Sequence, residues 1–359
     1  MTLPQPGLEL YPGRDDAGRD TEWWWRDQRE LMLPGSRLST WEVESRDGRR
    51  LICRRLPAAA GAGAGFADQL LDNEIRAMSR LATRYGRGDY PPELPRLTGY
   101  HFDTIEPYVL CLPFRGSCAD QGVRNLLSDQ RMAFAVGLLR ALAQLAAVEL
   151  VHGAVGLSTT WWDGSRVQLV NFECSAAVGE PRRLADHSAW ASPDQIRGTG
   201  RAHHGDDVFS AGLVIYELFT GIRPTGVRPP QVTGRGALLS ELLAGVFRPE
   251  AQHRPAAAEL LGRLSMDGNL PVPMDVDASL QAGRTRFDQV RRTKHPLLDE
   301  GHPPVPPAEP VEPTPGEPPG PPMPSVRRTG TSTTRVTIVG ALLTVFVVLL
   351  VLAMIIGLS

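Results

Sequence analysis

Lysine is almost absent from this chain. Of the 38 basic residues among 359, only Lys294 is a lysine and the others are arginines. Any chemistry that needs a lysine within residues 34–267, where we expect the folded body, is therefore excluded. The formal net charge is −2 and no long run of basic residues occurs. The sequence thus gives no reason to expect a nucleic-acid partner.

Cysteine is scarce and follows no metal-binding pattern. The four cysteines are Cys53, Cys111, Cys118 and Cys174. No two of them have the C-x-x-C spacing, and no histidine lies at zinc-finger distance. The N-terminus does not read as a secretory signal peptide. We therefore expect reduced, mostly buried thiols and no metal site.

Charge is missing altogether from residues 336–358, VTIVGALLTVFVVLLVLAMIIGL. As a helix these residues would extend about 34 Å, enough to cross a hydrocarbon core of about 30 Å. Arg327, Arg328 and Arg335 precede the segment and only Ser359 follows it. By the positive-inside rule the preceding body is cytoplasmic. We predict a single-pass protein of the cell membrane that contacts the lipid bilayer through residues 336–358.

The rest of the chain divides by composition. Residues 303–324 contain twelve prolines in 22 positions, which favours an extended polyproline II spacer. We assign 271–335 to a linker and 1–20 to a disordered N-terminus rich in proline, glycine and charge. Residues 22–33, with three consecutive tryptophans, predict a short helix or strand that packs on the folded body.

Within residues 34–267 the periodicity changes midway. The first part alternates as β-strands do, with one apolar helical face at 67–81. From residue 132 onward helical periodicity dominates, interrupted by a strand pair. The sequence therefore predicts an α+β body with a small β-rich part before a larger helical part. The expected strands are 41–43, 51–56, 108–114, 159–162 and 167–172, and the later helices are 132–150, 208–220, 238–246 and 256–264.

Four segments in this order resemble the bilobal Ser/Thr protein kinases of bacteria. The most specific is GDDVFSAGLVIYELFTGIRP at 205–224, which is similar to the central helix of the C-lobe. WASPDQ at 190–195 is similar to the A-P-E end of the activation segment. HRPAAAELL at 253–261 is similar to a late helix that begins with Arg-Pro. HGAVGLSTTWWDGSRVQLVNFE at 152–173 takes the place of the catalytic loop and the D-F-G segment. The resemblance implies an N-lobe at 21–115 and a C-lobe at 116–270.

The same resemblance implies that the chemistry is degenerate. His152 keeps the first position of H-R-D, but Ala154 replaces the aspartate that accepts the substrate proton. Thr159 replaces the magnesium-binding asparagine. Asn171-Phe172-Glu173 replaces D-F-G, so a neutral amide stands where a carboxylate should bind a divalent cation. Glu173 is the one residue that we consider as a substitute metal ligand.

The expected nucleotide site of the N-lobe is altered as well. Residues 34–44, PGSRLSTWEVE, contain only Gly35 where a G-x-G-x-x-G loop should approach the phosphates. Arg54 takes the position of the strand lysine, and Glu74 that of its helical partner. We expect an Arg54–Glu74 ion pair at the former ATP site, because arginine can bridge the two elements while crowding a nucleotide.

Residues that support the kinase fold are retained. Asp207 lies where the central helix of the family braces the backbone of the catalytic loop. Asp194 and Arg254 match the family's buried pair between the activation segment and the late helix. A retained scaffold without its catalytic residues is typical of a pseudokinase.

We therefore expect a membrane-tethered pseudokinase that works as a signalling scaffold or allosteric partner. Its partners would be proteins at the cytoplasmic face of the membrane, and we expect neither ATP nor Mg²⁺ as a bound cofactor. Two alternatives remain open at this point. One is a nucleotide-binding sensor without phosphoryl transfer, and the other is an atypical active Ser/Thr protein kinase.

Overall fold

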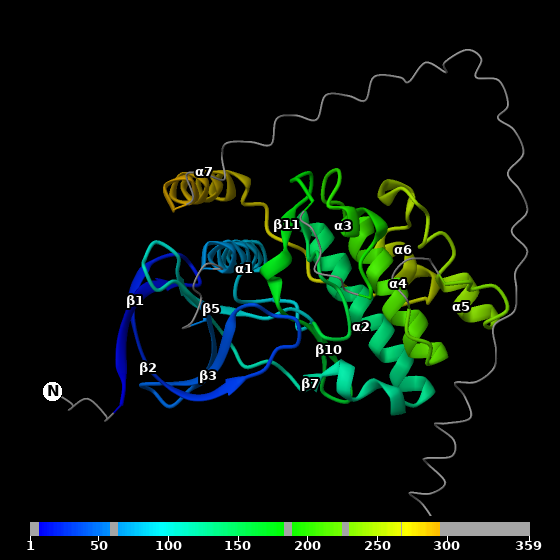
Figure 1. The fold of residues 1–359 in the computed structure, drawn as a ribbon, viewed down its shortest axis with the longest axis horizontal. Helices are drawn as coiled ribbons and strands as arrows, with labels where there is room; N and C mark the ends of the chain where they lie inside the picture. Colours follow the sequence, from blue (N-terminus) through cyan, green and yellow to red (C-terminus); the bar gives the residue numbers. More distant parts are fainter. Residues whose placement is uncertain (1–6, 58–63, 183–188, 225–229, 267, 295–359) are drawn as a thin grey trace, which may run out of the picture. The chain divides into compact units, whose positions relative to one another are not determined.

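The computed structural model describes residues 7–57, 64–182, 189–224, 230–266 and 268–294. The predicted spacer at 303–324 and the predicted membrane span at 336–358 lie outside these residues. Within the described part, no helix is both long and apolar enough to cross a bilayer. The described residues belong to one compact unit with a β-rich N-lobe and a helical C-lobe (Figure 1).

The N-lobe is a closed barrel of six antiparallel strands in the order β1-β2-β3-β4-β6-β5. One long helix, α1 (Ala64–Tyr85), packs against it and carries the apolar face expected from the sequence. The strand and helix predictions within residues 41–114 are confirmed. The barrel strands are β1 (Glu9–Asp15), β2 (Asp20–Leu31), β3 (Ser39–Ser45), β4 (Arg50–Arg55), β5 (Leu97–His101) and β6 (Tyr108–Cys111).

Strand β1 corrects the prediction of a disordered N-terminus at 1–20, although residues 1–6 are not described. The ring of Tyr11 stacks on Trp25 with centroids 3.7 Å apart, and Trp25 meets Tyr108 edge-on at 5.0 Å. Gly13 is required here, because a side chain at this position would collide with the Tyr108 hydroxyl. Aromatic burial therefore orders a segment whose proline, glycine and charge suggested disorder.

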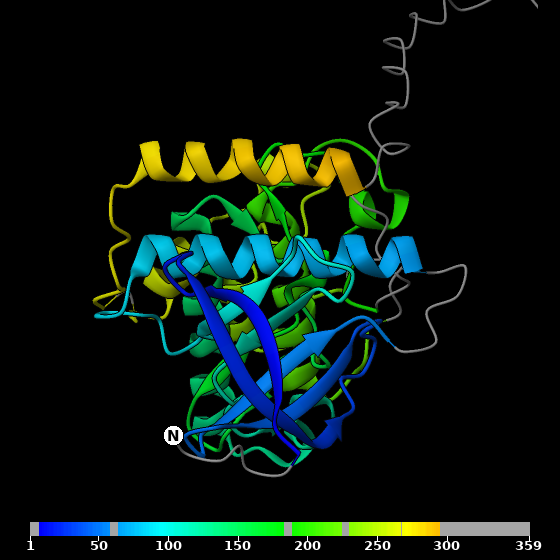
Figure 2. The same ribbon diagram turned by 90° about the vertical axis from the view of Figure 1, so that its left-hand side faces the viewer.

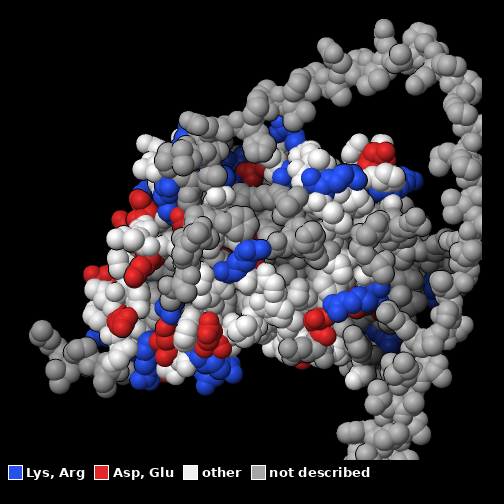
Figure 3. Space-filling view, viewed as in Figure 1, with Lys and Arg blue, Asp and Glu red and all other residues white. Residues whose placement is uncertain are grey.

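Charges of both signs are interspersed on the N-lobe face seen in Figure 3. Several of them form pairs between strands, such as Arg29 of β2 with Glu42 of β3 and Arg55 of β4 with Asp27 of β2. Such exposed pairs contribute only about 0–1 kcal/mol each, so the stability of the barrel comes mainly from its buried apolar side chains.

The C-lobe is built around α2 (Ser128–Ala147) and α4 (His204–Thr220), with most of α4 buried. Helix α4 begins at a cap in which His203 Nδ1 accepts from the Gly205 N–H, and it ends at Gly221 in the left-handed conformation. The remaining elements are short. They are β7 (Ser117–Cys118), β8 (Leu150–Val151), β9 (Thr160–Trp162), β10 (Val167–Leu169), β11 (Ala176–Ala177), α3 (Pro193–Arg197), α5 (Ala237–Leu242) and α6 (Ala257–Arg263).

A final helix, α7 (Asp277–Lys294), corrects the assignment of residues 271–294 to a linker. Its sequence is strongly polar and has little apolar periodicity, so the sequence pattern alone does not indicate a packed helix. In both ribbon views it lies beside α1 (Figures 1 and 2). The folded unit therefore includes a C-terminal helix that returns to the N-lobe.

Candidate functional site

The turn between β2 and β3 lines the cavity at which a kinase would bind its nucleotide. Pro34-Gly35 forms the turn, with Gly35 at φ 78° and the Ser36 N–H donating to the Leu33 carbonyl at 3.1 Å. Proline followed by a left-handed glycine is the preferred sequence of a type II turn. The turn directs the Ser36 hydroxyl inward, where it donates to Oε2 of Glu173 at 3.0 Å.

Arg54 lies at the centre of the site and is fully buried. Its Nη1 donates to Oε1 of Glu74 at 2.6 Å, so the two residues predicted to pair at the former ATP site do lie together. Its Nη2 contacts Oγ of Ser36 at 2.8 Å, Oδ1 of Asn171 at 2.9 Å and Oε2 of Glu173 at 3.2 Å. The guanidinium is thus held by four protein side chains from three parts of the chain.

The electrostatics of this cluster disfavour a phosphate. The side chains of Glu74 and Glu173 are each 4% exposed, and both face the single guanidinium of Arg54. Burial raises the pKa of Glu74 to about 7, Arg54 acts to lower it and Glu173 acts to raise it. Because Arg54 already contacts both carboxylates, its positive charge is not available to a phosphate group.

The degenerate catalytic positions are brought together at one cavity of about 940 Å³. Ala154, Thr159, Asn171 and Glu173 all line it. The hydroxyl of Thr159 donates to the Ala154 carbonyl at 2.8 Å and therefore helps to close its own loop. Asn171 adopts the left-handed conformation at φ 68°, which asparagine tolerates better than most residues.

These residues do not fit a magnesium ion. The amide oxygen of Asn171 and the carboxylate of Glu173 both accept from Arg54, so a guanidinium takes the place where a cation would be bound. The described residues contain no group of three or more His, Cys, Asp and Glu that could hold a metal. The idea of Glu173 as a substitute metal ligand therefore has no support in this geometry.

His152 and Phe172 pack edge-on beneath the site, with ring centroids 4.8 Å apart. His152 Nε2 lies 3.0 Å from the Val170 carbonyl oxygen, and its Nδ1 accepts from the Ala154 N–H at 3.3 Å. Both contacts suit a neutral ring with its proton on Nε2. Burial lowers the pKa of His152 to about 4, which keeps the ring neutral.

Asp207 holds the backbone of the loop that contains Ala154. Its two carboxylate oxygens accept from the N–H groups of His152 at 2.6 Å and Gly153 at 2.9 Å. Burial raises the pKa of Asp207 to about 7, while these two donors act to lower it. This is the position that the resemblance gave to a backbone-bracing aspartate.

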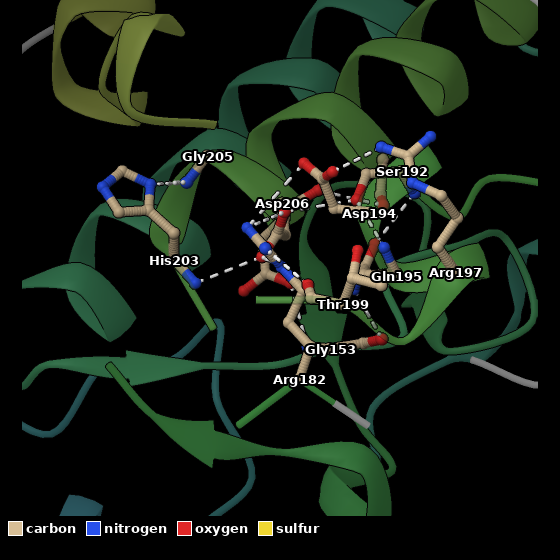
Figure 4. A network of polar contacts seen from close by, with 12 residues as sticks. Gly153, Arg182, Ser192, Asp194, Gln195, Arg197, Thr199, His203, Gly205 and Asp206 are labelled. Atoms are coloured by element: carbon tan, nitrogen blue, oxygen red, sulfur yellow. Dashed lines mark hydrogen bonds and ion pairs between the residues drawn. The ribbon is translucent and has the colours of Figure 1, made fainter. Parts of the chain in front are cut away.

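Asp206 is a buried residue whose structural role the sequence analysis did not predict. Figure 4 shows it at the centre of a polar network between the activation-segment region and α4. It accepts from Arg182 Nε at 2.9 Å and from Ser192 Oγ at 3.2 Å, and it lies 3.5 Å from Arg254 Nη1. Arg254 Nη2 is 3.7 Å from Asp194, whose side chain is 18% exposed against 1% for Asp206. The predicted pair is therefore part of a larger cluster centred on the adjacent aspartate.

Ile52 was also not considered in the sequence analysis, although its position relative to Arg54 can be read from the sequence. It lies two residues before Arg54 on the same strand, so both side chains face the same side of β4. The V-A-I-K motif has alanine at that position. Here the position holds a branched side chain that is 2% exposed and belongs to the main apolar core.

Comparison with known proteins agrees with a kinase-like chain. No protein-family model matches it. It is similar to "Interleukin-1 receptor-associated kinase-like 2" of Mus musculus, 26% identical over 255 residues, and of Rattus norvegicus, 26% identical over 258 residues. Each match covers 67% of this chain but only 39% of the relative. The relatives are mammalian, so the resemblance to bacterial kinases stays a prediction.

Proposed function

We propose that this chain is a pseudokinase that acts through protein contacts and transfers no phosphoryl group. The observation that carries the proposal is that both terminal nitrogens of Arg54 donate to protein groups, namely those of Glu74, Ser36, Asn171 and Glu173. In an active kinase the corresponding lysine pairs with phosphates and the D-F-G aspartate binds Mg²⁺. Here protein groups accept from both terminal nitrogens of Arg54, although its buried Nε has no partner among the described residues. Ala154 offers no base for the substrate hydroxyl.

Nucleotide binding and transfer assays on the full chain test this proposal. We expect no change in melting temperature with millimolar ATP, alone or with Mg²⁺ or Mn²⁺, and no phosphate incorporation. Stabilisation by ATP without transfer would instead favour a nucleotide sensor. Metal-dependent transfer that disappears in Glu173→Ala would favour an atypical kinase, because Glu173 would then be the metal ligand.

We further propose that residues 336–358 anchor the chain in the cell membrane, with the folded unit on the cytoplasmic side. The support is the sequence itself, since 23 consecutive uncharged residues follow three arginines. A tether of this kind raises the effective concentration of the domain for partners at the same surface.

The partner we propose is a protein at the cytoplasmic face of the membrane. The names of these relatives describe them as receptor-associated and kinase-like, which supports a role in a signalling assembly. Co-purification from membranes would test it, with a chain that carries an unrelated membrane anchor in place of residues 336–358. Recruitment predicts the same partner with either anchor, and loss of the partner from membranes when the anchor is deleted.

A further inference from the structure

Helix α7 runs antiparallel to α1 along much of its length (Figure 2). Just before α7 begins, the Met274 N–H donates to the Arg84 carbonyl near the C-terminal end of α1 at 2.6 Å. At the other end, Lys294 reaches the N-terminal half of α1. The C-terminal helix is therefore fixed to α1 at both ends.

Lys294 makes the polar part of this contact. Its Nζ donates to Oδ1 of Asp68 at 3.2 Å, Oδ1 of Asp72 at 3.0 Å and the carbonyl of Phe102 at 2.8 Å. Three donors of one ammonium group are thereby used. The single lysine of the chain is thus the residue that holds the end of α7 on the N-lobe.

Phe287 makes the apolar part. Its ring stacks on Phe102 with centroids 5.9 Å apart, and the guanidinium of Arg76 lies 5.6 Å from its centroid. Phe287 is the one buried side chain of residues 281–294, and Val290 is partly buried beside it. A helix held by so little apolar area has low local stability, because helices of this length depend on packing in water.

Helix α1, on which α7 packs, supplies one residue to each of two polar contacts at the candidate site. From α1, Glu74 pairs with Arg54 in the cleft. Two residues further along α1, Arg76 donates from Nη1 and Nη2 to the two carboxylate oxygens of Glu180, each at 2.6 Å. Any movement of α1 would therefore disturb both the cleft and the segment that follows β11.

We propose that α7 is a reversible clamp on α1, and that its docking keeps the Arg54–Glu74 pair closed. The inference deepens the proposed function, since it assigns to the inactive site a regulator within the same chain. A partner that displaced α7 would release α1 and open the cleft. Lys294 and Phe287 act as positioning residues through α1 and touch no ligand themselves.

Hydrogen–deuterium exchange on the full chain tests the clamp. We expect Phe287→Ala and Lys294→Gln to speed amide exchange in α7 at least tenfold and in residues 68–76 of α1 several-fold, with α4 unchanged. Lys294→Arg should restore protection, because it keeps the charge near Asp68 and Asp72. Arg286→Gln is the matched control, since Arg286 lies on α7 with an exposed side chain.

Two results would overturn the proposal. Faster exchange in α7 with unchanged exchange in α1 would make α7 a passive appendage. Equal effects of Lys294→Gln and Arg286→Gln would remove the specific role of the lysine. The measurement needs no nucleotide and no phosphoryl transfer, so its outcome is independent of the catalytic assays.

Discussion

Nη2 of Arg54 donates a hydrogen bond to Oδ1 of Asn171 at 2.9 Å, joining two residues 117 positions apart in the chain. Asparagine is neutral where the D-F-G motif has a carboxylate, and arginine stands where the motif of β4 has lysine. The two residue types suit each other, because the amide oxygen of Asn171 accepts a hydrogen bond from the guanidinium group of Arg54.

Removing Arg54 should therefore be costly for folding. Arg54→Ala leaves Glu74 and Glu173 buried without their cation, and we expect the free energy of unfolding to fall by about 3–5 kcal/mol. Urea denaturation measures it. The neighbouring Arg55→Ala is a matched control, because Arg55 and its partner Asp27 are 28% and 34% exposed and such a pair contributes about 1 kcal/mol or less. Similar losses in the two variants would contradict a buried cluster.

The network around Asp206 predicts an order of stabilities. Asp206→Asn should lower the free energy of unfolding by about 2–3 kcal/mol, because it weakens charged hydrogen bonds in a buried position. Asp194→Asn should cost about 1 kcal/mol or less, since that side chain is more exposed. Arg254→Ala should cost about 3–5 kcal/mol. Chemical denaturation of the three variants checks the order, and a larger effect at Asp194 than at Asp206 would reverse our assignment.

His152 predicts acid sensitivity. Its pKa is about 4 in the folded state against about 6.5 when unfolded, so the unfolded state binds more protons between these values. Stability should fall as the pH drops from about 6.5 to 4, by up to about 3 kcal/mol from this residue. His152→Gln should lose that pH-dependent part. An unchanged pH dependence in the variant would show that other groups cause it.

The membrane proposal predicts a simple fractionation result. The full chain should sediment with membranes and resist extraction by high salt, because an apolar helix is not released by screening charge. A chain ending at residue 325 should appear in the soluble fraction. If the truncated chain stays with the membrane, a second attachment exists within residues 1–325.

Much of the fold followed from local patterns. The α4 segment was recognised from its helical periodicity at 208–220 and from its similarity to the central helix of a kinase C-lobe, and Arg54 and Glu74 were located by motif spacing. These predictions work where sequence neighbours decide the structure. The burial of α1 followed likewise from one apolar face.

What the sequence did not predict depends on contacts between distant residues. The order of β1 comes from Tyr11 stacking on Trp25 and from pairing with β5, and neither is visible in a proline-containing segment read alone. Likewise α7 is ordered by Phe102 and two aspartates of α1. Asp206 and Asp207 are adjacent and chemically alike, so only the geometry of the helix start separates their roles.

The pairing of β1 with β5 has a further consequence for recognition. Arg14 and Asp15 of β1 lie opposite Tyr100 and Gly99 of β5, and this contact completes the ring of six strands. Only two residue pairs make this closure, so the two strands pair with each other over a short part of their length. A peptide that added a strand between β1 and β5 would have to open these pairs first, whereas a sheet with an open edge accepts a strand directly. The closure therefore makes strand addition at this seam more costly than binding through the side chains of the N-lobe.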